Sequence, residues 1–120
     1  NWGNYEDNLW NITNANSKYA IYDDKLENFD WTSGAYGIKD SDTIVLLSTG
    51  ASDDFSKQGI YDLAGNVWEW TLEYTANSSG PCAGRGGSYY NGGSSSPAAY
   101  RNYFFTTNYD DNIGFRLSLY

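Results

Sequence analysis

The chain has 120 residues, enough for one compact domain, and its 12 Tyr, 5 Trp, 5 Phe and 13 Gly favour strands and tight turns over long helices. Seven basic against 15 acidic residues give a net charge of −8, and the scattered basic residues exclude a nucleic-acid binder and disfavour an anionic membrane surface. No apolar stretch reaches the roughly 18 residues of a membrane-spanning helix, so we expect no membrane insertion.

The first half of the chain predicts loops and short strands. Residues 1–43 are polar and rich in Asn and Asp, which is typical of loops, and residues 18–29 favour a helical turn or two. Residues 43–47 form a β-branched and apolar run that predicts a buried strand. Residues 52–55 favour a turn or a single helical turn with a Ser or Asp cap.

The most patterned segment is 59–71, with the sequence GIYDLAGNVWEWT. Residues 64–66 predict a turn, because Ala-Gly-Asn carries the residues that turns require. In the alternation that follows, Trp68 and Trp70 share one face. This period of two predicts a strand that buries its tryptophans.

The C-terminal third predicts strands separated by polar turns. A loop over 78–84 is followed by a strand that begins in 85–89, by a second strand candidate over 98–107, and by a closing strand over 114–120. In the closing strand we expect Phe115, Leu117 and Leu119 to share one face.

Three motifs occur here in the order of a known family: GIYDLAGNVWEWT (59–71), RGGSY (85–89) and GFRLSL (114–119). The chain resembles the formylglycine-generating-enzyme, or sulfatase-modifying-factor, family, which is a variant of the C-type lectin fold. Residues 1–4 are similar to a Trp-Gly-Asn motif that lies upstream in that family. The resemblance implies one α+β, C-type-lectin-like domain over 1–120, rich in strands and loops with little helix. It covers only the later part of the family domain, and it is stronger evidence for fold than for function.

The chemistry of the family enzymes does not carry over to this chain. Those enzymes use two cysteines just after the Gly-Gly-Ser motif, and alignment on residues 85–89 places the matching positions at Asn91 and Ser96. Cys82 lies before the motif, and it is the only cysteine, so no intrachain disulfide forms. The chain also has no His, the usual general base. We therefore expect a protein that is not an enzyme.

A structural calcium ion is the cofactor that the resemblance implies. The family binds calcium around its equivalent of 59–71, which assigns side-chain oxygens to Asp62 and Glu69 and backbone carbonyls to Gly65 and Val67. The alternative is that Asp62 caps the turn, while Glu69 faces solvent or pairs with an arginine.

Residues 86–120 have a biased composition. They contain no Lys, Glu, Gln, Met or Trp, whereas the preceding 85 residues contain 14 of these. No codon that ends in a pyrimidine encodes any of the five. This bias resembles the output of diversity-generating retroelements, which mutate AAY codons and commonly target the C-terminus of a C-type-lectin-like domain. Tyr with Ser, Gly and Asn is also the composition of antibody-like binding surfaces.

We therefore expect a fixed scaffold over 1–88 and 113–120 and a variable ligand-binding region over 89–112. Its expected contact residues are aromatic, amide, hydroxyl or acidic: Tyr89, Tyr90, Asn91, Ser94, Ser95, Tyr100, Asn102, Tyr103, Phe104, Thr106, Asn108, Tyr109 and Asp110. The expected partner is a protein or glycan on a host or cell surface. The protein itself is expected on a phage tail (virion) or in an extracellular or cell-surface location, with an oligomer possible.

Two alternatives stay open. One is an adhesin or carbohydrate-binding domain of the same fold with a fixed specificity. The other is an enzyme of the sulfatase-modifying type, which the missing cysteines argue against. For the C-terminal composition alone, a further alternative is an aromatic-rich β-domain whose bias arises by chance.

Overall fold

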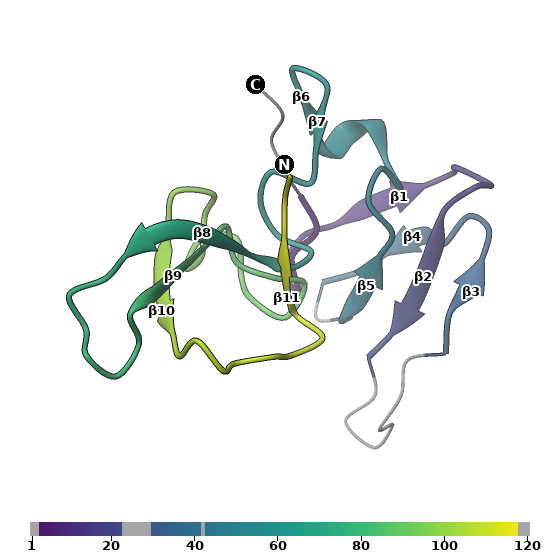
Figure 1. Ribbon diagram of the computed structural model, residues 1–120. Helices are drawn as coiled ribbons and strands as arrows, with labels where there is room; N and C mark the ends of the chain where they lie inside the picture. Colours follow the sequence, from purple (N-terminus) through teal and green to yellow (C-terminus); the bar gives the residue numbers. More distant parts are fainter. Residues whose placement is uncertain (1–2, 23–29, 42, 118–120) are drawn as a thin grey trace.

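The computed structural model describes residues 3–22, 30–41 and 43–117, which form short strands joined by long loops (Figure 1). The strands are β1 (Trp10–Ile12), β2 (Lys18–Ile21), β3 (Thr32–Ser33), β4 (Gly37–Lys39), β5 (Val45–Leu47), β6 (Ser56–Lys57), β7 (Ile60–Tyr61), β8 (Trp68–Tyr74), β9 (Cys82–Arg85), β10 (Arg101–Phe104) and β11 (Ile113–Phe115). A single 3-10 turn, η1 (Asp53–Phe55), is the helical element of the described part. Within that part, no helix has the length and apolarity that crossing a membrane requires.

The N-terminal half packs small sheets around an aromatic core. β1 pairs with β4, and β3, β2 and β5 form a three-stranded sheet in that order. Their inward residues, with η1, form one cluster of buried side chains: Trp10, Ile12, Val45, Leu47, Ala51 and Phe55. The edge of the Trp10 ring meets Tyr36 at 5.0 Å between centroids, an arrangement that aromatic pairs prefer.

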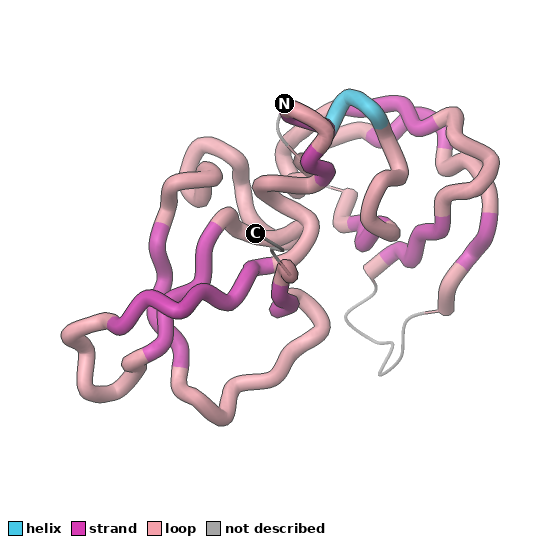
Figure 2. The backbone as a smooth tube through the Cα atoms, turned by 45° about the horizontal axis from the view of Figure 1, so that its top comes forward, coloured by secondary structure: helices cyan, strands magenta, loops and turns pink. Residues whose placement is uncertain are grey.

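The C-terminal half is built on one sheet of four strands in the order β10-β9-β8-β11 (Figure 2, where strands are magenta). β8 and β9 pair antiparallel, and β11 returns from the far end of the chain to pair parallel with β8. Phe104 on β10 packs edge-on against Trp68 and Trp70, with centroids 5.8 and 5.4 Å apart. The period-two prediction for the tryptophans is therefore confirmed, since both lie on the packed face of β8.

A buried amide network joins the two halves. The Asn66 side chain donates to Leu47 O and accepts from Leu47 N, at 2.8 and 3.0 Å. Its backbone N–H donates to Asn4 O at 2.7 Å, and the Asn4 side chain accepts from Trp10 Nε1 at 3.0 Å. Gly65 is required beside it, because its φ is +69° and a Cβ there would lie 2.3 Å from Asn4 O. The predicted turn at 64–66 thus fastens the two sheets together.

The structure confirms the buried strand at 43–47 as β5 and the capped turn at 52–55 as η1, where Ser52 accepts from Asp54 N. The helical prediction for 18–29 is wrong at its start, since Lys18–Ile21 is strand β2; residues 23–29 lie outside the described residues. The strand predicted to begin in 85–89 instead ends at Arg85. Gly86 and Gly87 turn the chain there, with φ of +90° and +72°.

The closing strand also differs from prediction. β11 covers Ile113–Phe115, and Phe115 and Leu117 are exposed rather than packed in the core. Both side chains line an open cavity that they share with Asp62 and Glu69, so they border solvent instead of the core. Leu119 lies outside the described residues.

Candidate functional site

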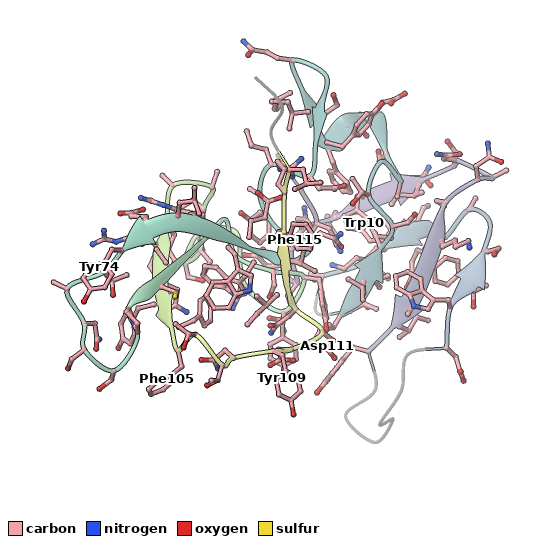
Figure 3. The ribbon with its side chains drawn as sticks, viewed as in Figure 1. Trp10, Tyr74, Phe105, Tyr109, Asp111 and Phe115 are labelled. Atoms are coloured by element: carbon pink, nitrogen blue, oxygen red, sulfur yellow. The ribbon has the colours of Figure 1, made fainter. Side chains whose placement is uncertain are left out.

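An exposed aromatic surface follows strand β10. Tyr103 lies on β10, Phe105 lies directly after β10, and Tyr109 lies in the loop that leads to β11. All three side chains are exposed, and that of Tyr109 is 94% exposed. Figure 3 shows Phe105 and Tyr109 on the same lower side of the molecule. Exposed aromatic side chains are enriched at protein–protein interfaces, where a few of them often supply much of the binding energy. We call Tyr103, Phe105 and Tyr109 the aromatic face.

The backbone under this face is held by its own polar side chains. Asn102 Oδ1 accepts from Tyr103 N at 2.9 Å, and Asn108 Oδ1 accepts from Phe105 N at 2.6 Å. Thr106 and Asp110 are exposed beside them. Beyond the loop, Trp68 N donates to Asn112 O at 2.7 Å, which fixes the loop to the start of β11. Asn102 and Asn108, predicted as ligand contacts, thus also shape the loop.

Tyr89 does not belong to the exposed surface. Its side chain is 1% exposed, and its hydroxyl donates to Asp111 Oδ1 at 3.1 Å. Burial, followed by the nearby Asp111 carboxylate, raises the pKa of the Tyr89 hydroxyl well above its ordinary value. The prediction of Tyr89 as a ligand contact is therefore corrected: its side chain joins the exposed loop to the interior. Phe104 likewise faces inward, against Trp68 and Trp70.

The remaining predicted contacts form a second exposed region. Tyr90, Ser94, Ser95 and Tyr100 are exposed, and the Tyr90 ring meets Tyr22 at 5.3 Å between centroids. Asn91 is half-buried, and its Oδ1 accepts from both Ser88 N and Ser88 Oγ at 2.9 Å. At Asn91, one of the positions that match the family cysteines, the side chain therefore closes a turn.

The arginines lie in ion pairs on the sheet. Arg85 and Arg101 both donate to the carboxylate of Glu73, and Arg85 does so at 2.7 Å. Hydrogen bonds from Arg101 and Arg85 lower the pKa of the Glu73 carboxyl. The cluster fixes β8, β9 and β10 to one another, so Arg101 stabilises the sheet although it lies within residues 89–112.

The four residues assigned to calcium line a single cavity of about 350 Å³, together with Arg116 and four others. Asp62 accepts from Gly50 N through Oδ2 at 3.1 Å, whereas its buried Oδ1 has no hydrogen-bond partner. Burial raises the pKa of the Asp62 carboxyl, although the hydrogen bond from Gly50 N and the charge of Arg116 act in the opposite direction. The structure thus brings Asp62, Gly65, Val67 and Glu69 together around an unsatisfied oxygen.

Arg116 already supplies a positive charge in this cavity. Its Nη2 donates to the Glu69 carboxylate and, at 2.9 Å, to Asp62 O. No cluster of three His, Cys, Asp or Glu exists among the described residues, so a metal here would need backbone carbonyls. The donor set consists of oxygens only, with Asp62 Oδ1 unsatisfied, and this chemistry fits a calcium ion that shares Glu69 with Arg116.

A larger groove of about 840 Å³ lies between the N-terminal residues 5–9 and the loop 93–99. Of the predicted contacts, Ser94 lines it. This groove was not predictable from the sequence, because its walls come from segments about 90 positions apart that share no joint pattern.

Comparison with protein families matches residues 1–119 to a model described as a sulfatase-modifying factor enzyme 1-like domain. No significant match exists among the curated proteins or among the solved structures.

Proposed function

The chain belongs to the family of sulfatase-modifying factor enzyme 1-like domains, and from that premise we propose that it is a recognition module rather than an enzyme. In this proposal, residues 90–112 contact a protein or glycan on a host or cell surface. The family scaffold presents them, and a retroelement diversifies them. One fold can carry many functions, and the residues on its surface determine which function a given chain has. The proposal therefore depends on those residues.

The observation that carries the proposal is the aromatic face. The side chains of Tyr103, Phe105 and Tyr109 are exposed, and aromatic residues are the type that interfaces favour. They lie on an edge strand and the loop after it, where Asn102 accepts from Tyr103 N and Asn108 accepts from Phe105 N. A surface that is fixed before binding loses less conformational entropy on binding, which favours affinity.

The composition of the C-terminal segment supports diversification. Residues 86–120 contain only residue types that codons ending in a pyrimidine encode. The buried position of Tyr89 narrows the proposed variable region to Tyr90 and the residues after it, because a varied residue in the interior would disturb packing.

Calcium enters the proposal as a structural ion. It would sit among the oxygens of Asp62, Glu69, Gly65 and Val67 and would hold the turn at 64–66 against β8. The proposed location is a phage tail or another extracellular surface, where the protein meets its ligand. An oligomer there would bind several ligands at once and so gain avidity.

Sequence comparison of sibling genes tests the proposal. We expect differences concentrated between Tyr90 and Asp111, at codons that match adenines in a nearby template repeat. Sequence differences spread uniformly along the chain would instead favour an adhesin of the same fold with one fixed specificity. A glycan array would then identify that specificity.

A direct test of the enzyme alternative uses a cysteine-containing sulfatase peptide. We expect no conversion of its cysteine to formylglycine, because Asn91 and Ser96 replace the two thiols. Detectable conversion by the purified protein would overturn the proposal.

A further inference from the structure

The groove between residues 5–9 and 93–99 is large enough for a ligand. Its volume of about 840 Å³ falls within the roughly 300–1,000 Å³ of typical ligand pockets. Small residues make it hollow, among them Gly93, Ala98 and Ala99.

The wall formed by residues 5–9 is held by a buried lysine. Lys39 is 1% exposed, and its ammonium group donates to the carbonyls of Tyr5, Glu6 and Asn8 at 3.1, 2.7 and 2.9 Å. Charged donors make the stronger hydrogen bonds of proteins. This segment therefore keeps its shape without a ligand.

The opposite wall is fastened to the first. The Tyr5 hydroxyl lies 2.9 Å from both Gly86 O and Ser96 O, and Gly93 N donates to Asp7 Oδ1 at 2.9 Å. Burial raises the pKa of Tyr5 to about 12, so its hydroxyl stays neutral and keeps its hydrogen. Both walls are thus positioned in advance, as a binding site requires.

The lining combines apolar surface with one charge. Leu9, Pro97 and Ala98 present apolar atoms, and Leu9 is exposed although it is a large aliphatic residue. Among the described residues that line the groove, Asp7 is the charged one. The chemistry is therefore that of a site for an apolar chain with a positive end.

We propose that this groove binds a lysine side chain of a partner protein, with the aliphatic part against Leu9, Pro97 and Ala98 and the ammonium group at Asp7. The inference rests on the proposed function, because Ser94 and its neighbours in the groove belong to the recognition region. It gives the partner a stated chemistry, namely an exposed basic residue in an apolar setting.

Titration of the isotope-labelled protein with n-hexylamine, hexan-1-ol and hexanoate, followed by NMR, tests the site. We expect shifts at the Leu9, Ala98 and Ala99 amides, with hexylamine binding about two- to fivefold more tightly than hexanol, the range of an exposed ion pair, and hexanoate binding most weakly. Equal affinities for the amine and the carboxylate, or shifts that spread evenly over the chain, would overturn the proposal.

Variants separate the charge from the cavity. Asp7→Asn keeps an acceptor for Gly93 N and should remove the preference for the amine, whereas Asp54→Asn, the same change in the exposed turn η1, should leave it intact. Ala98→Trp should block all three compounds. Should that variant not fold, Leu9→Ser on the exposed wall should weaken all three instead.

A peptide comparison identifies the source of the ammonium group. The blocked tripeptide Ac-Leu-Lys-Leu-NH2 should bind more tightly than hexylamine, and Ac-Leu-Glu-Leu-NH2 should bind more weakly. Tighter binding of the free amine than of the lysine peptide would overturn the assignment to a protein partner. If no probe binds while sibling genes still differ between Tyr90 and Asp111, the inference about the groove fails and the proposed function stands.

Discussion

The hydroxyl of Tyr89 donates to Asp111 Oδ1 at 3.1 Å, and this bond joins a side chain of the interior to a loop that is exposed on its other side. Tyr89 also donates its backbone N–H to Asn66 O at 2.8 Å, the residue that links the two sheets. The position of the proposed recognition loop is therefore coupled to the centre of the scaffold. Asp111 lies beside Tyr109 at this lower side of the molecule (Figure 3).

Tyr89→Phe should lower the free energy of unfolding by about 1 kcal/mol, because it removes one hydrogen bond and leaves Asp111 able to reach water. Urea denaturation measures the effect. Tyr109→Phe is the matched control, since Tyr109 is 94% exposed, and it should stay within about 0.5 kcal/mol of the parent protein. Equal effects of the two changes would show that Tyr89 is not anchored as described.

The free energy of unfolding should depend on pH in part through the ionisation of Asp62. Burial raises the pKa of this carboxyl above its ordinary 3.8, so the folded state resists ionisation of Asp62 more than the unfolded state does. Its contribution favours folding below pH 3.8 and is lost as the pH rises through the raised pKa. In calcium-free buffer, the free energy of unfolding of the parent protein should therefore decrease as the pH rises above 3.8, and this decrease should be smaller in Asp62→Asn.

Asp111 contributes with the same sign, since burial also raises its pKa, so part of the fall should persist in Asp62→Asn. The half-buried Glu73 acts in the opposite sense, because hydrogen bonds from Arg101 and Arg85 lower the pKa of its carboxyl. An Asp62→Asn profile that stays parallel to the parent profile would contradict the assignment to Asp62.

The tryptophan strand and its turn were predictable because their signals are local. The alternation around Trp68 and Trp70 specifies a strand with one packed face, and Phe104 completes that face in the structure. The Gly-Asn pair likewise predicts a turn, and Gly65 and Asn66 both adopt positive φ there. These features depend on neighbours within a few residues.

The burial of Tyr89 was not predictable in the same way. Composition predicts an exposed ligand contact for both Tyr89 and Tyr90. Only the path of the chain after Gly87 determines which of the two rings is buried. That path depends on a close approach, because a Cβ at Gly87 would lie 2.7 Å from Ser96 O. The role of Lys39 was equally hidden, since its partners are backbone carbonyls, which no residue type reveals.

Calcium should raise the melting temperature if the cavity at Asp62 and Glu69 holds it. At a concentration about 100-fold above the dissociation constant, binding adds about 2.7 kcal/mol, which for a domain of this size raises the midpoint by several degrees. Differential scanning calorimetry with calcium, and then with a chelator, measures the change.

Asp62→Asn and Glu69→Gln should each abolish most of this calcium effect, whereas Asp54→Asn should preserve it. A melting temperature that chelation leaves unchanged would rule out the calcium site. In that case Arg116 alone neutralises Glu69, which is the alternative that the sequence left open.

Lys39→Met should destabilise the protein strongly, by about 3 kcal/mol, because it leaves the buried carbonyl of Tyr5 and the partly buried carbonyls of Glu6 and Asn8 without a charged donor. Lys18→Met is the control, since Lys18 is exposed on β2 and should change the free energy of unfolding by less than about 0.5 kcal/mol. Hydrogen exchange should locate the loss of Lys39 at residues 5–9, where the wall of the groove loses its support. Uniformly faster exchange would mean instead that Lys39 stabilises the fold as a whole and does not specifically position that wall.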